Sequence, residues 1–255
     1  MRNIKITVEY DGTHFKGWQI QNPQDRTVQG ELEKALQKIF ERSRSDSIRV
    51  FGSGRTDSGA HAKGQVANFK IDSTMPTTEI VNALNGNLPE DIVILDAKEV
   101  AANFHAQFDA KQKTYRYTIL NRKPRAGIDR HFCWHYPYKL NLNLLKKEAK
   151  ALVGKHDFRS FMASDPHEKI KDKNTVRQIY AVKITKRGEY LWIDITANGF
   201  LYKMVRNIVG TLVEVGNSRI PPGSVNAILK KKNRIYASDT APAKGLCLLK
   251  VSYHK

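Results

Sequence analysis

The sequence predicts an α+β protein whose sheet is largely antiparallel. Two kinds of pattern support this: short segments that alternate apolar and polar residues, typical of half-buried strands, and longer segments with apolar residues at helical spacing. The two kinds interleave along all 255 residues without the regular strand–helix alternation of a parallel α/β sheet. Hydrophobic residues make up 40% of the chain, an ordinary share for a protein that buries a core.

The first half is predicted to contain both strands and helices. Residues 4–10 alternate apolar with polar or charged side chains, which predicts a strand. Apolar residues recur at helical spacing over residues 27–42, and Thr27 is placed to cap that helix. A second helix is predicted at residues 78–85. Further strands are predicted at residues 48–51, 65–71, 92–95 and 113–120.

The second half uses similar parts. A strand at residues 131–136 precedes a helix at 143–152, and the Lys-Arg-Gly-Glu segment 186–189 joins two strands as a hairpin. Those strands are predicted at 176–186 and 190–197, the later helices at 200–215 and 222–231, and a last strand at 246–253. Pro124, Gly127 and several basic residues predict a linker at 122–130, which divides the chain into domains 1–121 and 131–255.

The charge of the chain is its least ordinary property. There are 43 Lys and Arg residues against 25 Asp and Glu residues, a formal net charge of +18. This indicates a polyanionic partner, because each phosphate that a cation neutralises releases condensed counterions. A merely basic soluble protein is the alternative. The clusters expected to bind RNA, each of which could instead be a solvated face, are 122–125, 146–147, 169–173 and 230–234.

Cysteine usage and hydropathy point to the cytoplasm. Cys133 and Cys247 lie far apart and form no CxxC pair, which fits a reducing compartment rather than a disulfide framework. The first residues lack the apolar block of a signal peptide. The apolar stretch 208–215 is too short to span a bilayer and carries Glu214. We therefore expect a soluble cytoplasmic protein with no membrane partner.

The glycine-rich segment 52–65 is the most informative part of the chain. Its glycines surround Arg55 and Asp57, and glycine lets the backbone approach a ligand closely. A dinucleotide fingerprint starting at Gly52 would need glycine at Asp57, and a phosphate loop ending at Gly64 would need lysine at Gln65. What remains is a carboxylate and a guanidinium in a tight turn. On spacing alone, Asp57 could simply cap the turn that follows.

The segment Gly54-Arg-Thr-Asp-Ser-Gly-Ala-His61 resembles the catalytic motif of the tRNA pseudouridine synthase A family. Other segments agree with the family in the same order and together span almost the whole chain: 10–19, 27–30, 84–89, 104–108, 113–117, 156–158, 204–210 and 243–246. The resemblance implies a homodimeric enzyme that converts uridine to pseudouridine at positions 38, 39 and 40 of the tRNA anticodon stem-loop. It also implies no metal and no organic cofactor.

The same resemblance implies roles for individual residues. Asp57 would be the nucleophile, and Arg206 would pair with its carboxylate. That pairing suits the chemistry, because a carboxylate attacks only when ionised and a guanidinium favours the ionised form. Tyr115 would stack on the target base once it is flipped out of the RNA. Arg55 would hold the flipped nucleotide's phosphate or fill the space that it leaves.

Each of these residues has a plainer alternative. Arg206 lies among apolar residues of a predicted helix, so we expect it to be partly buried, although it could lie on the helix's polar side. Tyr115 could be an ordinary core aromatic of its strand. Ser58 and Ala60 replace the Ala and Val frequent in the family, and Cys247 stands where an aromatic is common. These departures leave the reactive groups in place.

The resemblance further implies the architecture. Each half would be a ferredoxin-like or RRM-like unit, and the two would share one extended mixed, largely antiparallel sheet with flanking helices and a central basic cleft.

Two other functions stay open on the residues alone. One is a non-catalytic RNA-binding protein, which would have little reason to place Asp57 in a turn that attracts phosphate. The other is a nucleotide-dependent enzyme, such as a methyltransferase, that uses residues 52–59 as its cofactor loop.

Residues 131–135 carry three possible metal ligands. On a strand, His131, Cys133 and His135 would share one face and could hold zinc. No fourth ligand with suitable spacing lies nearby, and simple alternation produces such triplets. We therefore expect no metal site.

Overall fold

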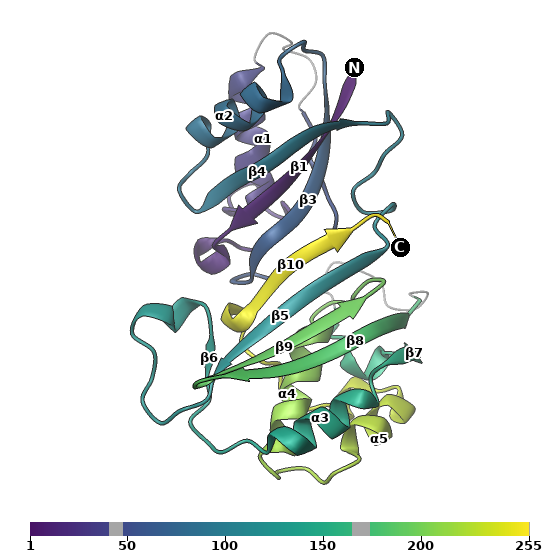
Figure 1. The fold of residues 1–255 in the computed structure, drawn as a ribbon. Coiled ribbons are helices and arrows are strands. Elements are labelled where there is room, and N and C mark those ends of the chain that lie inside the picture. The colour runs from purple at the N-terminus through teal and green to yellow at the C-terminus, as the bar shows by residue number, and fades with distance from the viewer. Residues whose placement is uncertain (41–47, 165–173, 255) are drawn as a thin grey trace. The chain divides into compact units, whose positions relative to one another are not determined.

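A computed structural model describes residues 1–40, 48–164 and 174–254 of the chain. They form two compact units, Met1–Lys111 with Cys247–Lys255, and Gln112–Leu246 (Figure 1). Each unit combines a sheet with helices, so the predicted α+β class is confirmed. Residues 122–130, predicted as a linker, lie inside the second unit.

The first unit is built on a sheet with strand order β4-β1-β3-β10, and the short strand β2 pairs with β3. Its strands are β1 (Arg2–Tyr10), β2 (Phe51–Gly52), β3 (His61–Ile71), β4 (Ile92–Val100) and β10 (Leu246–Ser252). Strand β1 is antiparallel to β3 and β4, whereas β10 runs parallel to β3. The sheet of this unit is therefore mixed and largely antiparallel, as predicted.

Two helices, α1 (Val28–Ile39) and α2 (Thr77–Asn87), lie on one face of this sheet (Figure 1). Alternate β1 residues Ile4, Ile6 and Val8 are fully buried. Because successive strand residues point to opposite faces, Asn3 and Lys5 lie on the other face. The predicted cap is confirmed, since the Thr27 hydroxyl accepts a hydrogen bond from the Gly30 amide at 3.2 Å.

The second unit is built on an antiparallel sheet with strand order β5-β9-β8-β7, with β6 parallel to β5. Its strands are β5 (Gln112–Leu120), β6 (Trp134–His135), β7 (Gly154–Asp157), β8 (Val176–Arg187) and β9 (Tyr190–Ala197). Helices α3 (Leu142–Lys150), α4 (Met204–Gly216) and α5 (Ser224–Lys231) are grouped on one side of these strands (Figure 1). The predicted hairpin is confirmed, with Gly188 at φ +56°.

Several predicted boundaries differ from those of the structure, for identifiable reasons. Strand β4 continues to Val100, beyond the predicted end at residue 95, because β1 pairs with it along that length. The predicted strand 48–51 contributes only its last residue to β2. Helix α4 begins at Met204 rather than at residue 200, because Lys203 has a left-handed backbone at φ +56°. Helix α5 begins after Gly223, which is also left-handed.

Candidate active site

Asp57 lies in the loop between β2 and β3, at the start of a tight turn. The Ala60 amide donates to the Asp57 carbonyl at 3.0 Å, and Gly59 within the turn has φ +76°. A glycine is needed there because side chains rarely tolerate this backbone conformation. The Asp57 side chain is half-buried and that of Arg55 is exposed. The sequence therefore places the predicted nucleophile in an ordered turn.

The loop that carries Asp57 is held by residues on both sides of it. The Trp18 amide donates to the Thr56 carbonyl at 3.2 Å, and the buried Thr56 hydroxyl lies 2.7 Å from the Tyr10 hydroxyl. From the other side, the buried Gln65 amide donates to the Gly54 carbonyl at 2.8 Å and accepts from Ser53. Buried hydrogen bonds of this kind are costly to break, because each group left behind loses a partner that water does not readily replace.

Two glycines allow the chain to approach the Asp57 turn closely. A Cβ atom at Gly12 would lie 1.9 Å from the Ala60 carbonyl oxygen, and one at Gly17 would lie 2.7 Å from that of Thr56. Both contacts involve backbone, which cannot rotate away as a flexible side chain would. Glycine is therefore needed at these two positions of segment 10–19, because a side chain there would clash with the Asp57 turn.

Arg206 lies in the first turn of α4 and is half-buried, as predicted. Its Nε donates to the Ala241 carbonyl at 2.7 Å, and the Ala241 amide donates back to the Arg206 carbonyl at 3.2 Å. This pair of bonds fixes the base of the guanidinium against residues 237–242, which we call the strap. The side chain is thus oriented by the protein rather than by solvent.

Asn207 anchors the strap from inside the helix. Its fully buried amide donates to the Phe161 carbonyl at 2.8 Å and accepts from the Thr240 hydroxyl at 2.6 Å. Arg234 donates to the same Asn207 oxygen at 3.2 Å and to the Ala237 carbonyl at 2.8 Å. Asn207 is not among the site residues predicted from the sequence. A buried amide in an otherwise apolar helix was the available signal, because such a group must find partners.

Tyr115 and Tyr117 lie two residues apart on β5 and are both buried. The Tyr117 hydroxyl donates to the Pro242 carbonyl at 2.6 Å, and burial raises the pKa of this hydroxyl well above its usual range. Tyr117 is therefore a structural core residue that also holds the strap. The Tyr115 and Phe200 rings form a T-shaped pair, with 5.1 Å between centroids and an interplanar angle of 88°.

Lys113 lies on the same face of β5 as the two tyrosines. Burial, together with the nearby positive charge of Arg177, lowers the pKa of the Lys113 amine to about 8. Desolvation disfavours a charged amine, and a second cation adds to that effect. Sequence spacing gave no hint of this perturbed lysine.

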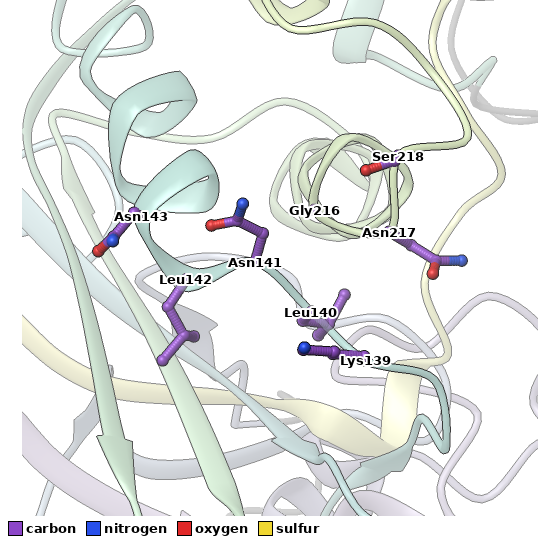
Figure 2. Close-up of a pocket in the computed structure, with 8 residues that line it drawn as sticks. All are labelled: Lys139, Leu140, Asn141, Leu142, Asn143, Gly216, Asn217 and Ser218. Carbon is purple, nitrogen blue, oxygen red and sulfur yellow. The ribbon is translucent and has the colours of Figure 1, made fainter.

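The four predicted site residues divide between the two units. Asp57 and Arg55 belong to the first unit, and Tyr115 and Arg206 belong to the second. In each unit, the two predicted residues are held by contacts within that unit. The structure also shows a shallow hollow in the second unit, between the start of α3 and the end of α4 (Figure 2). None of the four predicted residues lines it.

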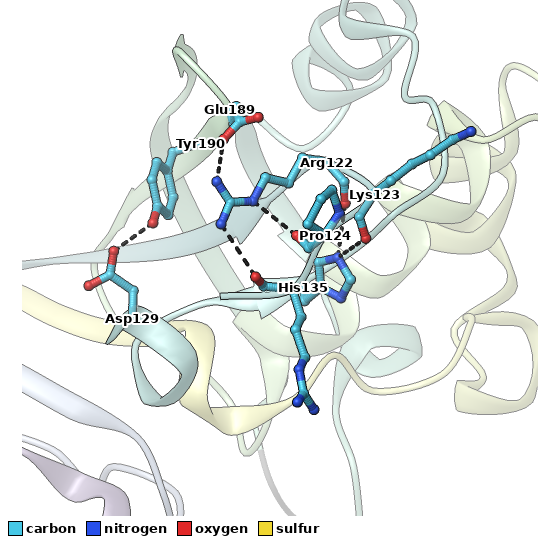
Figure 3. A network of polar contacts seen from close by, with 8 residues as sticks. Arg122, Lys123, Pro124, Asp129, His135, Glu189 and Tyr190 are labelled. Carbon is cyan, nitrogen blue, oxygen red and sulfur yellow. Dashed lines mark hydrogen bonds and ion pairs between the residues drawn. The ribbon is translucent and has the colours of Figure 1, made fainter. Parts of the chain in front are cut away.

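The structure corrects the strand arrangement expected at residues 131–135. His131 ends a 3-10 helix, Ile128–His131, and only Trp134–His135 forms a strand, so the three candidate ligands do not share a strand face. The Cys133 sulfur instead lies 3.2 Å from the Asp129 carbonyl. His135 Nε2 lies 2.9 Å from the carbonyl of Arg122 (Figure 3). These side chains therefore make polar contacts with neighbouring carbonyls in a segment where a longer strand was predicted.

The predicted basic clusters have different surroundings. Arg122 pairs with Glu189 at 2.6 Å (Figure 3), and Arg234 donates into the strap, so neither is simply a solvated charge. Lys146 and Lys147 are exposed on α3. The cluster 169–173 lies outside the described residues.

Of the helices in the ranges that the structure describes, none has the length and apolar character needed to cross a bilayer.

Comparison with known proteins gives a consistent result along the chain. The sequence profile of a family described as tRNA pseudouridine synthase matches residues 6–109 and 149–254. Proteins named tRNA pseudouridine synthase A from Thermoanaerobacter sp. (strain X514) and Clostridium acetobutylicum are each 46% identical over 253 residues, which cover 99% of this chain and 100% of the relative. A Bacillus cereus protein named tRNA pseudouridine synthase A 1 is 44% identical over 254 residues, 100% of both chains.

Proposed function

The chain belongs to the tRNA pseudouridine synthase family, and we propose that Asp57 is the nucleophile of its reaction. The chain is an isomerase that converts uridine to pseudouridine in the anticodon stem-loop of tRNA. Family membership therefore favours the enzyme over both alternatives, the non-catalytic RNA-binding protein and the nucleotide-dependent methyltransferase. The observation that carries the assignment of Asp57 is its half-buried carboxylate in a turn fixed by buried hydrogen bonds.

The reaction needs a group that can attack and then leave. The N1–C1′ bond breaks, the uracil turns, and C5 bonds to C1′; C5 loses a proton and N1 gains one, so composition and redox state do not change. An ionised Asp57 can form a transient bond to the sugar or to the base and is released at the end. A rigid turn favours this, because a nucleophile held in the attacking geometry does not pay an ordering cost during reaction.

Arg206 is proposed to keep the Asp57 carboxylate ionised and oriented. A guanidinium offers a planar set of donors that suits a carboxylate, and its charge favours the deprotonated form. Support comes from the second unit alone: the bond from Nε to the Ala241 carbonyl restricts rotation of the group. A preoriented arginine loses less conformational freedom when it binds a carboxylate than a solvent-exposed one would.

Tyr115 is proposed to stack on the flipped base, with the Phe200 edge contact holding the tyrosine ring in place. Stacking of this kind is worth about 1–3 kcal/mol per base, which offsets part of the cost of extracting the nucleotide. Arg55, which is exposed, is proposed to hold the phosphate of that nucleotide or to fill the space that the base leaves.

The finer features of the family complete the proposal. We propose modification at tRNA positions 38, 39 and 40, a homodimer, a cytoplasmic location, and two ferredoxin-like or RRM-like halves whose sheets join beside a basic cleft. The net charge of +18 supports an RNA-binding surface of this kind. No metal or organic cofactor enters the proposed chemistry.

The test is pseudouridine mapping of unmodified tRNA transcripts incubated with pure protein. One transcript set carries uridine at positions 38, 39 or 40, and a matched set carries cytidine there and keeps its other uridines. Pseudouridine is expected only in the first set, and the Asp57→Asn variant should form none while still binding the transcripts. Modification elsewhere in the matched set would contradict the proposed positions. Unimpaired modification by the variant would contradict the proposed nucleophile.

A further inference from the structure

Residues 101–109 of the first unit form a loop that is fixed to the sheet by buried amides. The Asn3 side chain donates to the carbonyls of Ala101 at 3.0 Å and Phe104 at 2.9 Å. The Asn68 side chain accepts from the Ala106 amide at 2.8 Å and donates to Asn3 at 3.0 Å. Both asparagines are almost fully buried. The loop therefore lies over the sheet face opposite α1 and α2, held in one conformation.

This fixed loop and the neighbouring strand β2 together present a row of rings to solvent. The Phe51 ring lies 5.1 Å from that of His105, and the His105 ring lies 4.3 Å from that of Phe108. Phe108 is 75% exposed and Phe51 is 39% exposed. We call Phe51, His105 and Phe108 the aromatic ridge. A single exposed apolar residue is ordinary, but three adjacent rings, two on a loop fixed by buried amides and one on strand β2, form a ready surface for a flat apolar group.

Lysines and acids both lie near this loop: Lys5 and Lys98 with Asp96 are on the sheet, and Asp109 is within the loop. Lys5 Nζ lies 5.9 Å from the Phe104 ring centroid and 5.7 Å from that of Tyr253. In the sheet, Lys5 is the register partner of Asn68 and of Lys98, and Lys98 pairs with Asp96 at 3.2 Å. Asp109 accepts a hydrogen bond from the His105 amide at 2.8 Å.

We propose that the aromatic ridge stacks on an unpaired base of the RNA substrate, with Lys5 facing the backbone phosphates beside it. Aromatic side chains next to positive charge are the combination that binds single-stranded nucleic acid, since every base has a π-face and every nucleotide a phosphate. The chain's charge of +18 favours a polyanion over a second copy, which would carry the same charge. The inference rests on the proposed tRNA substrate and adds a contact outside the four predicted site residues.

The test measures binding of a fluorescein-labelled oligouridylate to the full chain by anisotropy. Phe108→Ala should weaken binding on the order of 5- to 150-fold, the factor that corresponds to about 1–3 kcal/mol per stacked base. Phe108→Leu, which keeps an apolar side chain, should weaken it similarly. Phe108→Trp should retain binding, and its added fluorescence should be quenched by the RNA. Leu95→Ala, at a half-exposed apolar residue of β4, is the matched control and should bind as wild type.

Fold is checked by melting temperature, which should not change for a side chain this exposed. Wild-type affinity for oligouridylate in both Phe108→Ala and Phe108→Leu would overturn the proposal. So would a loss of self-association in Phe108→Ala, seen by sedimentation, with RNA affinity intact, because the ridge would then join copies of this chain. Pseudouridine formation by wild type and Asp57→Asn is measured in parallel. If Asp57→Asn stays active while Phe108→Ala loses binding, the nucleophile assignment fails and the ridge stands.

Discussion

Asp57 and Arg206 are positioned in different ways. Asp57 is held by backbone: its turn closes on itself, and Gly12 and Gly17 let a neighbouring segment approach to contact distance. Arg206 is held by side chains: Asn207, Thr240 and Arg234 fix the strap that its Nε binds. Both residues thus depend on segments distant in the sequence, Asp57 through backbone contacts and Arg206 through a strap held by side chains, and the family resemblance rather than the local sequence singled them out.

The largest effect is expected from Asn207→Ala, which breaks the side-chain support alone. The change removes the donor that Asn207 supplies to the buried Phe161 carbonyl, together with an acceptor in the part-buried bonds from Thr240 and Arg234. We expect a loss of about 3 kcal/mol in the free energy of unfolding, from about 1–3 kcal/mol per unsatisfied buried group. Urea denaturation measures it. Asn87→Ala, at the exposed end of α2, is the control and should cost much less.

Because the strap binds Arg206, Asn207→Ala should also lower kcat more than it raises KM, when assayed at a temperature where the variant is folded. Hydrogen exchange should show faster exchange of the strap amides than of residues 53–60. A variant that loses stability but keeps the wild-type kcat would show that the strap has no part in positioning Arg206.

Gly12→Ala breaks the backbone support instead. The new Cβ would lie 1.9 Å from the Ala60 carbonyl oxygen, so the Asp57 turn must shift. Overpacking of this kind costs about 1–3 kcal/mol, and we expect about 2 kcal/mol here together with a fall in kcat. Gly86→Ala is the matched control, because nothing lies within 4 Å of a Cβ there. If both variants keep wild-type stability and activity, the close approach does not position the turn.

The contrast between the two supports explains which parts of the molecule the sequence predicted. The Thr27 cap, the hairpin at Gly188 and the bond from the Ala60 amide that closes the Asp57 turn each join residues a few positions apart, and all three features were predicted. The role of Asn207 depends on Thr240 and Phe161, and nothing in the local sequence predicts which residues become its partners.

Some strand lengths were predicted wrongly because they also depend on residues that are distant in the sequence. Strand β4 was predicted to be too short because its extension depends on pairing with β1, whose residues lie near the start of the chain. Residues 131–136 alternate in residue type as a strand would, yet only part of this segment forms a strand. Cys133 and His135 there contact the carbonyls of Asp129 and Arg122. Tertiary context outweighed local propensity in both cases.

A smaller effect is expected on the pH dependence of the free energy of unfolding, through Lys113 of the second unit. Burial and Arg177 lower the pKa of Lys113 to about 8, below its value in the unfolded chain. Between that pKa and about 10.4 the unfolded chain binds more protons, so this group makes stability rise as pH increases through the window. Its partial exposure limits the rise to about 1–2 kcal/mol.

Lys113→Met should lack this rise and be more stable than wild type at pH 7, where the cost of burying the charge is fully present. Chemical denaturation at pH 7 and pH 10 measures both effects, with Lys146→Met on the exposed face of α3 as the control. A wild-type protein and a Lys113→Met variant with the same pH dependence would show that burial does not perturb this lysine.

The most direct test of the account is the single-turnover rate of pseudouridine formation by Asp57→Asn at saturating tRNA, with Kd measured on the same samples. We expect a Kd close to that of wild type and a rate reduced on the order of 10⁴-fold or more, because the nucleophile is lost. A rate within about tenfold of wild type at unchanged Kd would contradict it, because a residue that forms the covalent bond cannot be replaced at so small a cost.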